Sequence, residues 1–385
     1  MIYFIRLFNL TINEIRIMRI ERIELRHIKM KLKNPFKTSM GTDFYVEHLI
    51  IKVDSEGLTG WGECVAEGNP FYSYETVETS WHIIKDFIIP SIIGKKVSNL
   101  DDEINNWKRI RGHRMAKAGL EAALWDLFAK AKNISLSEMM GGKRKKIDVG
   151  VSIGIQRTDK ELLNKIGDYL KEGYKRIKIK IEPGYDLKPL GAIRKNFPDI
   201  LLQVDANSAY SSKHFNLLKK FDEYNLLLIE QPLGYDDIYQ HSKLQKILKT
   251  PICLDESIHS LEDTITANEL GACKIINIKP GRVGGFSEAI KIHNYCMKNK
   301  MPIWCGGMLE TGIGRAGNVA LASLKNFSLP GDISASKRYF EEDIVEPEFT
   351  VEKDGTMKVP EGAGIGVKVN MNFLNRITIK KLTFR

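Results

Sequence analysis

Several features that mark membrane, disulfide-linked or zinc-binding proteins are missing from this sequence. Its 385 residues contain no run of about 18 consecutive apolar residues, so no transmembrane helix is predicted. The five cysteines are an odd number and form no C-x-x-C pair, which argues against a disulfide framework and a thiolate zinc site. We therefore expect a reduced, cytoplasmic protein with no membrane partner.

A secretion signal is also missing, although the N-terminus is apolar. Residues 1–17 lack a basic beginning and a small-residue cleavage site, and Arg6, Glu14 and Arg16 interrupt the apolar residues. We predict that residues 1–17 are an extension upstream of a native start at Met18. An additional strand is the alternative.

The chain has no basic stripe with interleaved aromatic residues, which nucleic-acid-binding proteins carry. Its formal net charge is +10, but the lysines and arginines are scattered, and the densest run is only residues 143–146. We interpret that run as a solvated linker and expect no nucleic-acid partner. The basic balance favours anionic small molecules in general.

The clearest pattern that is present is a repeat of short apolar runs, each ending in one charged residue. Four of these runs end at Asp205, Glu230, Asp255 and Lys279, at spacings of 25, 25 and 24 residues. Such runs are typical of buried parallel strands, and amphipathic, helix-like stretches fill the intervals. Similar runs bring the total to eight strand candidates, at 149–152, 176–180, 201–205, 226–230, 251–255, 275–279, 302–305 and 329–333. Eight units of about 25 residues predict a (β/α)8 barrel, with a doubly wound open sheet as the alternative.

The segments before and after this repeat have a different pattern. Strand-like stretches at 19–31, 47–54 and 58–64, with helix-like stretches at 75–89 and 113–130, predict an α+β capping domain. Beyond residue 340 we expect strands at 349–352 and 356–359 around an Asp354-Gly355 turn, in a segment that returns to the capping domain. The predicted organisation is extension 1–17, capping domain 18–140, barrel 141–340 and C-terminal segment 341–385.

Three successive predicted strands end in carboxylates: Asp205, Glu230 and Asp255. The C-terminal ends of barrel strands meet at one mouth, where three carboxylates would repel one another unless a cation neutralised them. Oxygen ligands suit hard divalent cations. We predict that the three carboxylates bind Mg²⁺, with Mn²⁺ as a substitute. Capping of the following helices is the structural alternative.

Lysines flank these acids. Lys178 and Lys180 share one face of their strand, and Lys279 ends the strand after Asp255. Because neighbouring ammonium groups depress each other's pKa, we expect a neutral amine that acts as a general base. A cation on the substrate carboxylate would let this base remove a proton from the adjacent carbon. Ordinary salt bridges to the carboxylates are the alternative.

Together these motifs resemble the enolase superfamily, specifically its muconate-lactonising subgroup. The resemblance extends over residues 18–370 and includes the stretches 61–64, 122–126, 204–207, 229–232, 254–257 and 277–285. Finer motifs at 35–39, 151–154, 306–312 and 331–334 are similar to the o-succinylbenzoate synthase / N-acylamino acid racemase family. No histidine ends the seventh strand, where mandelate-racemase-type members carry one. Asp332 stands alone where dipeptide epimerases carry Asp-x-Asp.

The resemblance implies a role for individual residues. Lys180 would be the acid/base on one face of the substrate and Lys279 would stand on the other, with Lys178 beside Lys180. Asn207 and Glu256 would orient the metal ligands, with a helix-start acid as the alternative for Glu256. Substrate contacts are implied for Phe36, Ser152, Asn207, Gly307, Met308 and Leu309. Phe36 and Ser152 have a plain structural role as their alternative.

The resemblance also implies an activity. Synthase members dehydrate a cyclohexadiene carboxylate to o-succinylbenzoate for menaquinone synthesis, and racemase members invert N-acylamino acids. We predict an o-succinylbenzoate synthase, a magnesium-dependent hydro-lyase. N-acylamino acid racemase, or both activities in one site, is the alternative, and dipeptide epimerase is a remote one. We expect a small carboxylate substrate and a homo-oligomer. A barrel that only binds is the non-enzyme alternative.

One further motif, Gly312–Gly317, matches the dinucleotide fingerprint G-x-G-x-x-G and precedes Asp332 by 20 residues. It lies on the seventh βα unit, so too little chain follows for the second half of a dinucleotide-binding domain. We therefore expect an anion site at a helix start, or tight packing, and no NAD.

Overall fold

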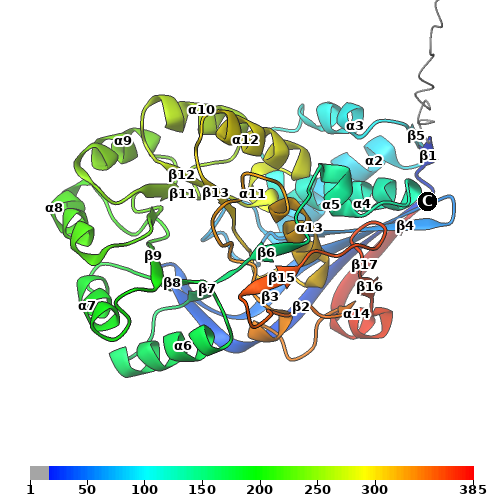
Figure 1. The fold of residues 1–385 in the computed structure, drawn as a ribbon. Helices are drawn as coiled ribbons and strands as arrows, with labels where there is room; N and C mark the ends of the chain where they lie inside the picture. The colour runs from blue at the N-terminus through cyan, green and yellow to red at the C-terminus, as the bar shows by residue number, and fades with distance from the viewer. Residues whose placement is uncertain (1–16) are drawn as a thin grey trace, which may run out of the picture.

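The computed structural model describes residues 17–385, so the predicted extension lies outside the described residues except for Ile17. Three buried hydrophobic clusters are present among these residues: a large one that includes the barrel strands and the helices around them, one in a smaller domain beside the barrel, and a small one of Leu228, Cys253, Ile275 and Trp304. Figure 1 shows the barrel in green and yellow and the smaller domain mainly in blue and cyan. No helix of residues 17–385 is long and apolar enough to cross a membrane.

Seven parallel strands form the wall of the barrel, in the order β13-β12-β11-β10-β9-β8-β7. Their side chains are almost all buried, as the apolar runs predicted. The strands are β7 (Gly150–Ile153), β8 (Arg176–Lys180), β9 (Leu201–Asp205), β10 (Ile229–Glu230), β11 (Ile252–Leu254), β12 (Ile275–Ile278) and β13 (Ile303–Cys305).

The eighth predicted strand, 329–333, closes the barrel without forming a regular strand. On one side the Asp332 amide donates to the Cys305 carbonyl at 2.9 Å, and on the other the Gly150 amide donates to the Gly331 carbonyl at 2.7 Å. Pro330 has no N–H to donate, which explains why the ladder is irregular here. The barrel prediction is confirmed with two modifications, because this eighth strand is irregular and only a short 3-10 turn, Ser336–Arg338, follows it where a helix was expected.

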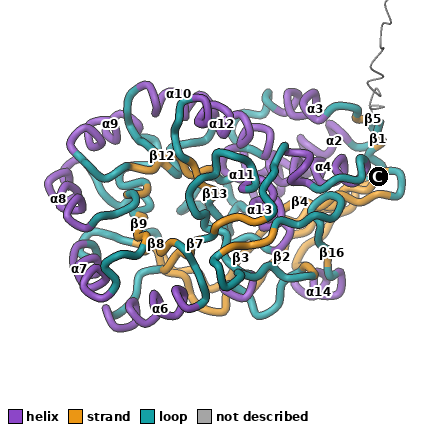
Figure 2. Tube along the Cα trace, viewed as in Figure 1, coloured by secondary structure: helices purple, strands orange, loops and turns teal. Residues whose placement is uncertain are grey.

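Helices cover the outside of the strands, and Figure 2 shows α6 to α10 and α12 as an arc around them. Several begin at a capping hydroxyl, such as Thr158 before α6 and Ser260 before α10. The helices of the barrel are α6 (Asp159–Lys171), α7 (Leu187–Asn196), α8 (Phe215–Lys219), α9 (Ile238–Ile247), α10 (Leu261–Glu269), α11 (Pro280–Val283), α12 (Phe286–Lys298) and α13 (Gly312–Ala322).

The capping domain consists of a four-stranded antiparallel sheet, in the order β17-β2-β3-β4, with helices packed on it. Close approach of α4 to β4 requires glycine, because a Cβ on Gly62 would lie 2.2 Å from the Gly119 carbonyl oxygen. The elements are β1 (Met18–Arg19), β2 (Arg22–Thr38), β3 (Gly41–Ser55), β4 (Leu58–Cys64), α1 (Val77–Ile83), a π-helical turn (Ile84–Ile88), α2 (Ile89–Ile92), β5 (Lys96–Val97), α3 (Leu100–Trp107), α4 (Arg114–Ala131) and α5 (Leu136–Met140).

The long β2–β3 hairpin reaches from the capping domain to the mouth of the barrel (Figure 1). Near its tip the Lys37 carbonyl accepts a hydrogen bond from the Ile155 amide at 2.9 Å, just beyond β7. The Ser39 hydroxyl donates to the Ala206 carbonyl at 3.0 Å, just beyond β9. The hairpin tip therefore lies over the C-terminal ends of the barrel strands.

The C-terminal segment contacts both parts of the molecule. The Asp354-Gly355 turn is present, but residues 349–352 form no strand, so that part of the prediction is wrong. β15 pairs instead with β6, the short strand that leads into the barrel, and β17 joins β2 in the capping sheet. The elements are β6 (Lys146–Asp148), β14 (Val345–Glu346), β15 (Thr356–Lys358), β16 (Lys368–Val369), α14 (Met371–Ile377) and β17 (Thr378–Phe384).

Candidate active site

Three fully buried carboxylates lie side by side at the mouth of the barrel. Asp205 and Glu230 are the last residues of β9 and β10 and are directly paired in register, and Asp255 follows β11. Parallel strands bring their C-terminal ends to the same edge, so the sequence spacing places all three acids together.

The acids nearest β8 are bound by its two lysines. The Lys178 ammonium lies 2.9 Å from Asp205 Oδ2, 2.8 Å from Glu230 Oε2 and 2.5 Å from Asp332 Oδ2. The Lys180 ammonium donates to Asp205 Oδ2 at 2.7 Å and to Asn207 Oδ1 at 2.6 Å. The alternation of β8 thus brings both lysines to the acids, as predicted.

The predicted effect of one lysine on the other is wrong for Lys178. Burial lowers the pKa of its ammonium, but the negative charges of Asp205, Asp332 and Glu230 raise that pKa by more, to well above its usual range. The three carboxylates in contact with Lys178 thus raise its pKa by more than a neighbouring cation lowers it. Lys178 therefore forms ion pairs with three carboxylates, as the salt-bridge alternative describes.

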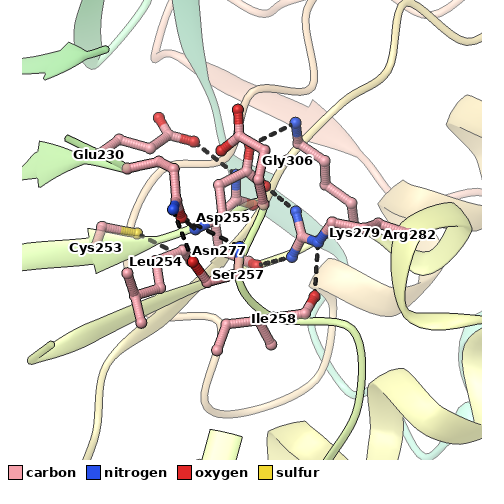
Figure 3. A network of polar contacts seen from close by, with 12 residues as sticks. Glu230, Cys253, Leu254, Asp255, Ser257, Ile258, Asn277, Lys279, Arg282 and Gly306 are labelled. Carbon is pink, nitrogen blue, oxygen red and sulfur yellow. Dashed lines mark hydrogen bonds and ion pairs between the residues drawn. The ribbon is translucent and has the colours of Figure 1, made fainter. Parts of the chain in front are cut away.

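A second lysine-acid cluster lies on the other side of the mouth, and Figure 3 shows it from close by. The Lys279 ammonium donates to Asp255 Oδ2 at 2.8 Å and to the Tyr72 hydroxyl at 2.9 Å. The Arg282 guanidinium binds Asp255 Oδ1, and its Nε donates to the Ile258 carbonyl at 2.7 Å. Both oxygens of Asp255 are therefore bound by cations.

One cavity of about 140 Å³ connects the two clusters. Lys180 belongs to β8 and Lys279 follows β12, with three strands between them in the curled sheet, so the two lysines approach the cavity from different walls. The buried acids lie beneath it. All the predicted substrate contacts line this cavity, together with the three lysines: Phe36, Ser152, Asn207, Gly307, Met308 and Leu309.

Glu256 lies in the turn after β11 and contacts the Lys180 cluster. Its Oε1 accepts a hydrogen bond from Asn207 Nδ2 at 2.8 Å, while its buried Oε2 has no hydrogen-bond partner among the described residues. Burial and the negative charge of Asp205 raise the pKa of Glu256 to about 7. Since α10 begins only at Leu261, the helix-start alternative does not describe this residue.

Three functional groups were missed at the level of the sequence. Asp332 binds Arg176 at 2.6 Å as well as Lys178, and the sequence had indicated no role for it in the site. Arg282 lies within the family motif at 277–285, but the sequence analysis assigned it no role in the site. Tyr72 comes from a capping-domain loop 207 residues away from Lys279, and no local pattern indicates it.

The backbone amides of the glycine-rich fingerprint at the start of α13 already bind two carboxylate side chains of the protein itself. The Gly314 amide donates to Glu63 Oε2 and the Gly312 amide to Asp343 Oδ1, both at 2.8 Å. A Cβ on Gly317 would lie 2.5 Å from the Phe286 ring, so close packing also requires glycine there. Protein carboxylates thus take the positions that a ligand phosphate would need.

The acids fit a hard divalent cation by their chemistry. In residues 17–385 no three His, Cys, Asp or Glu side chains are arranged to hold a metal ion as they stand, and each predicted ligand is bound by a lysine or arginine. Burial and the charge of Asp205 raise the pKa of Glu230. Three adjacent carboxylates offer only oxygen donors, which suit Mg²⁺ or Mn²⁺.

The chain combines two features: a barrel with buried acids and lysines at its mouth, and a separate capping domain that covers this mouth. Enzymes of the enolase type share this arrangement. Residues 21–141 match the N-terminal domain of mandelate racemase / muconate lactonizing enzyme, and residues 161–373 match the enolase C-terminal domain-like family. The chain belongs to the enolase superfamily, in the o-succinylbenzoate synthase / N-acylamino acid racemase family.

Relatives of known activity cover nearly the whole chain. It is 50% identical over 366 residues to the o-succinylbenzoate synthase of Bacillus subtilis, covering 95% of this chain and 98% of that protein. It is 44% identical over 366 residues to the N-succinylamino acid racemase of Amycolatopsis sp, covering 95% and 99%. The crystal structure of an enolase-superfamily member from Listeria innocua is similar, with a TM-score of 0.92, 44% identity and coverage of 95% and 99%.

Proposed function

We propose that this chain is an o-succinylbenzoate synthase, a lyase that dehydrates a hydroxylated cyclohexadiene carboxylate. The observation that carries this proposal is the position of Lys180, which lines the cavity directly above the buried acids. The 50% identity to a synthase over nearly the full length of both proteins supports the same activity.

Lys180 would perform both proton transfers of the dehydration. Its amine takes the proton from the carbon next to the substrate carboxylate, the carbon–oxygen bond to the hydroxyl group breaks, and the same proton leaves with the hydroxyl as water. The ring electrons then become aromatic. Hydrogen bonds to Asp205 and Asn207 hold the Lys180 nitrogen at the edge of the cavity.

Asp205, Glu230 and Asp255 would hold Mg²⁺, with Mn²⁺ as a substitute. When bound, the cation supplies positive charge beside the substrate carboxylate, where negative charge develops as the proton leaves. Asn207 and Glu256 would orient the acids from the side of the cavity. Phe36, Ser152 and Gly307–Leu309 would enclose the rest of the substrate and exclude water.

Racemisation of N-acylamino acids is the second candidate, and one specific observation favours it. Inversion needs a base on each face of the substrate carbon, and Lys180 and Lys279 line the same cavity from separate walls. One lysine takes the proton and the other returns a proton to the opposite face. A site with this geometry can perform both reactions.

The test is a direct comparison of both reactions with purified protein and Mg²⁺. Dehydration is followed by the loss of diene absorbance, and racemisation of an N-succinylamino acid by chiral chromatography, with Lys180→Ala as the control. We expect both activities in the wild type and neither in the variant. Failure to dehydrate the diene with either Mg²⁺ or Mn²⁺ would contradict the synthase proposal. Cytoplasmic location and homo-oligomerisation stay predictions.

A further inference from the structure

The capping domain contributes two carboxylates to the wall of the cavity, well away from the three buried acids. Asp43 lies in β3 opposite Phe36 at the tip of the hairpin, and Glu67 follows β4. Both line the cavity that contains Lys180 and Lys279. Two acids therefore face a substrate whose reacting carboxylate is itself an anion.

These two carboxylates differ from the acids beneath the cavity because they have no bound cation. Among residues 17–385, neither Asp43 nor Glu67 makes a side-chain hydrogen bond or an ion pair, whereas Asp205, Glu230 and Asp255 are each bound by lysine or arginine. Burial and the negative charge of Asp43 raise the pKa of Glu67 to about 7, and burial raises the pKa of Asp43. A positive group placed between them would relieve both costs.

A second cavity of about 220 Å³ continues outward from this pair. It shares five wall residues with the first cavity, and all of them come from the capping domain or the loop after β13: Asp43, Glu67, Asn69, Met308 and Leu309. A substrate held by its carboxylate above the buried acids can therefore extend a long side chain past the two acids.

We propose that Asp43 and Glu67 bind the positively charged end of a substrate side chain, so that the enzyme favours N-acylated amino acids with an ammonium or guanidinium group. This inference rests on the proposed function in its racemase form. The acyl carboxylate of an N-succinylamino acid would be repelled by the pair, so it points elsewhere and the amino acid side chain faces the acids. The diene substrate of the synthase reaction carries no cation and makes no use of the pair.

The test compares two substrates that differ in charge and hardly in shape. N-succinylarginine ends in a guanidinium group, and N-succinylcitrulline ends in a neutral urea group of the same length. Racemisation of each is measured by chiral chromatography. We expect the wild type to prefer the arginine substrate by about tenfold or more in kcat/KM, and Glu67→Gln or Asp43→Asn to reduce that preference by about tenfold.

Glu47→Gln is the matched control, because Glu47 lines the outer cavity but is already bound by Lys29 at 2.7 Å and His27 at 3.0 Å. This variant should keep the preference of the wild type. Equal kcat/KM of the wild type for both substrates would overturn the inference while leaving racemisation intact, whatever the variants do. Racemisation of neither substrate would overturn the inference and the racemase function on which it rests.

Discussion

The two walls of the cavity hold their lysines in different ways. Lys180 on β8 is bound by Asp205, the last residue of the adjacent strand β9, and by Asn207 just beyond it. Lys279 is bound by Asp255 of the barrel and by Tyr72 of the capping domain, whose ring also lies beneath its ammonium with 4.5 Å between the nitrogen and the ring centroid. The side chains that bind the first lysine directly all come from the barrel, whereas those that bind the second come from both domains.

This difference separates the two proposed reactions. Dehydration needs one base, and in our proposal Lys180 would supply it from a strand of the barrel wall. Racemisation would also need Lys279, and one of the two hydrogen bonds of its ammonium goes to Tyr72 in a loop of the capping domain. Changes in the capping domain should therefore affect inversion more than dehydration.

The largest expected effect is that of metal removal, which should abolish both dehydration and racemisation. Chelation followed by dialysis should abolish turnover, because Asp205 and Asp255 would provide metal ligands from the two sides, with Glu230 between them. Mg²⁺ or Mn²⁺ should restore the rate. Asp205→Asn, Glu230→Gln and Asp255→Asn should each weaken Mg²⁺ binding in a calorimetric titration, with an unchanged circular dichroism spectrum. Full activity in excess EDTA would contradict the metal proposal.

Replacement of one lysine at a time should distinguish the walls. Lys180→Ala should lower the rate of dehydration by about 10² to 10⁴, the usual contribution of general acid–base catalysis. Lys279→Ala should lower it less, since its ammonium would act there only as a fixed positive charge. Steady-state rates at saturating substrate measure both. An equal loss in the two variants would mean that dehydration uses both walls alike.

The smallest effect concerns the contact between the domains. Tyr72→Phe keeps the ring but removes the hydroxyl that accepts from Lys279, and a lost hydrogen bond to a charged group is worth about tenfold in rate. We expect this loss in racemisation and a smaller one in dehydration. Tyr74→Phe is the matched control, because Tyr74 is exposed in the same loop and its hydroxyl lies 3.4 Å from Arg114. Equal losses in the two reactions would show that Tyr72 does not act through Lys279.

Local patterns were sufficient to predict the barrel and most of its mouth. Strand ends recur at a fixed spacing, so the positions of Asp205, Glu230 and Asp255 follow from the repeat, and alternation along β8 places Lys178 beside Lys180. The partners of these lysines are less local. Asp332 reaches Lys178 only because the segment after β13 closes the barrel, and its charge helps to raise a pKa that was predicted to fall.

Contacts between the domains could not be read from the sequence. The loop that contains Tyr72 has no periodic pattern, and its position is set by packing of the capping domain on the barrel. β15 likewise pairs with β6, a partner more than 200 residues earlier, where a local hairpin with residues 349–352 was predicted. Sequence patterns indicate where strands lie, but distant pairings depend on the complete fold.

Exchange of the alpha proton in D₂O tests the two-wall geometry most directly. Each enantiomer of an N-succinylamino acid is incubated with Lys180→Ala or Lys279→Ala and followed by proton NMR. Neither variant should racemise the substrate. Lys279→Ala should exchange only the enantiomer whose proton faces Lys180, with retained configuration, and Lys180→Ala should exchange only the other enantiomer. If both variants exchange both enantiomers equally, the lysines do not act on opposite faces and the two-base account is wrong.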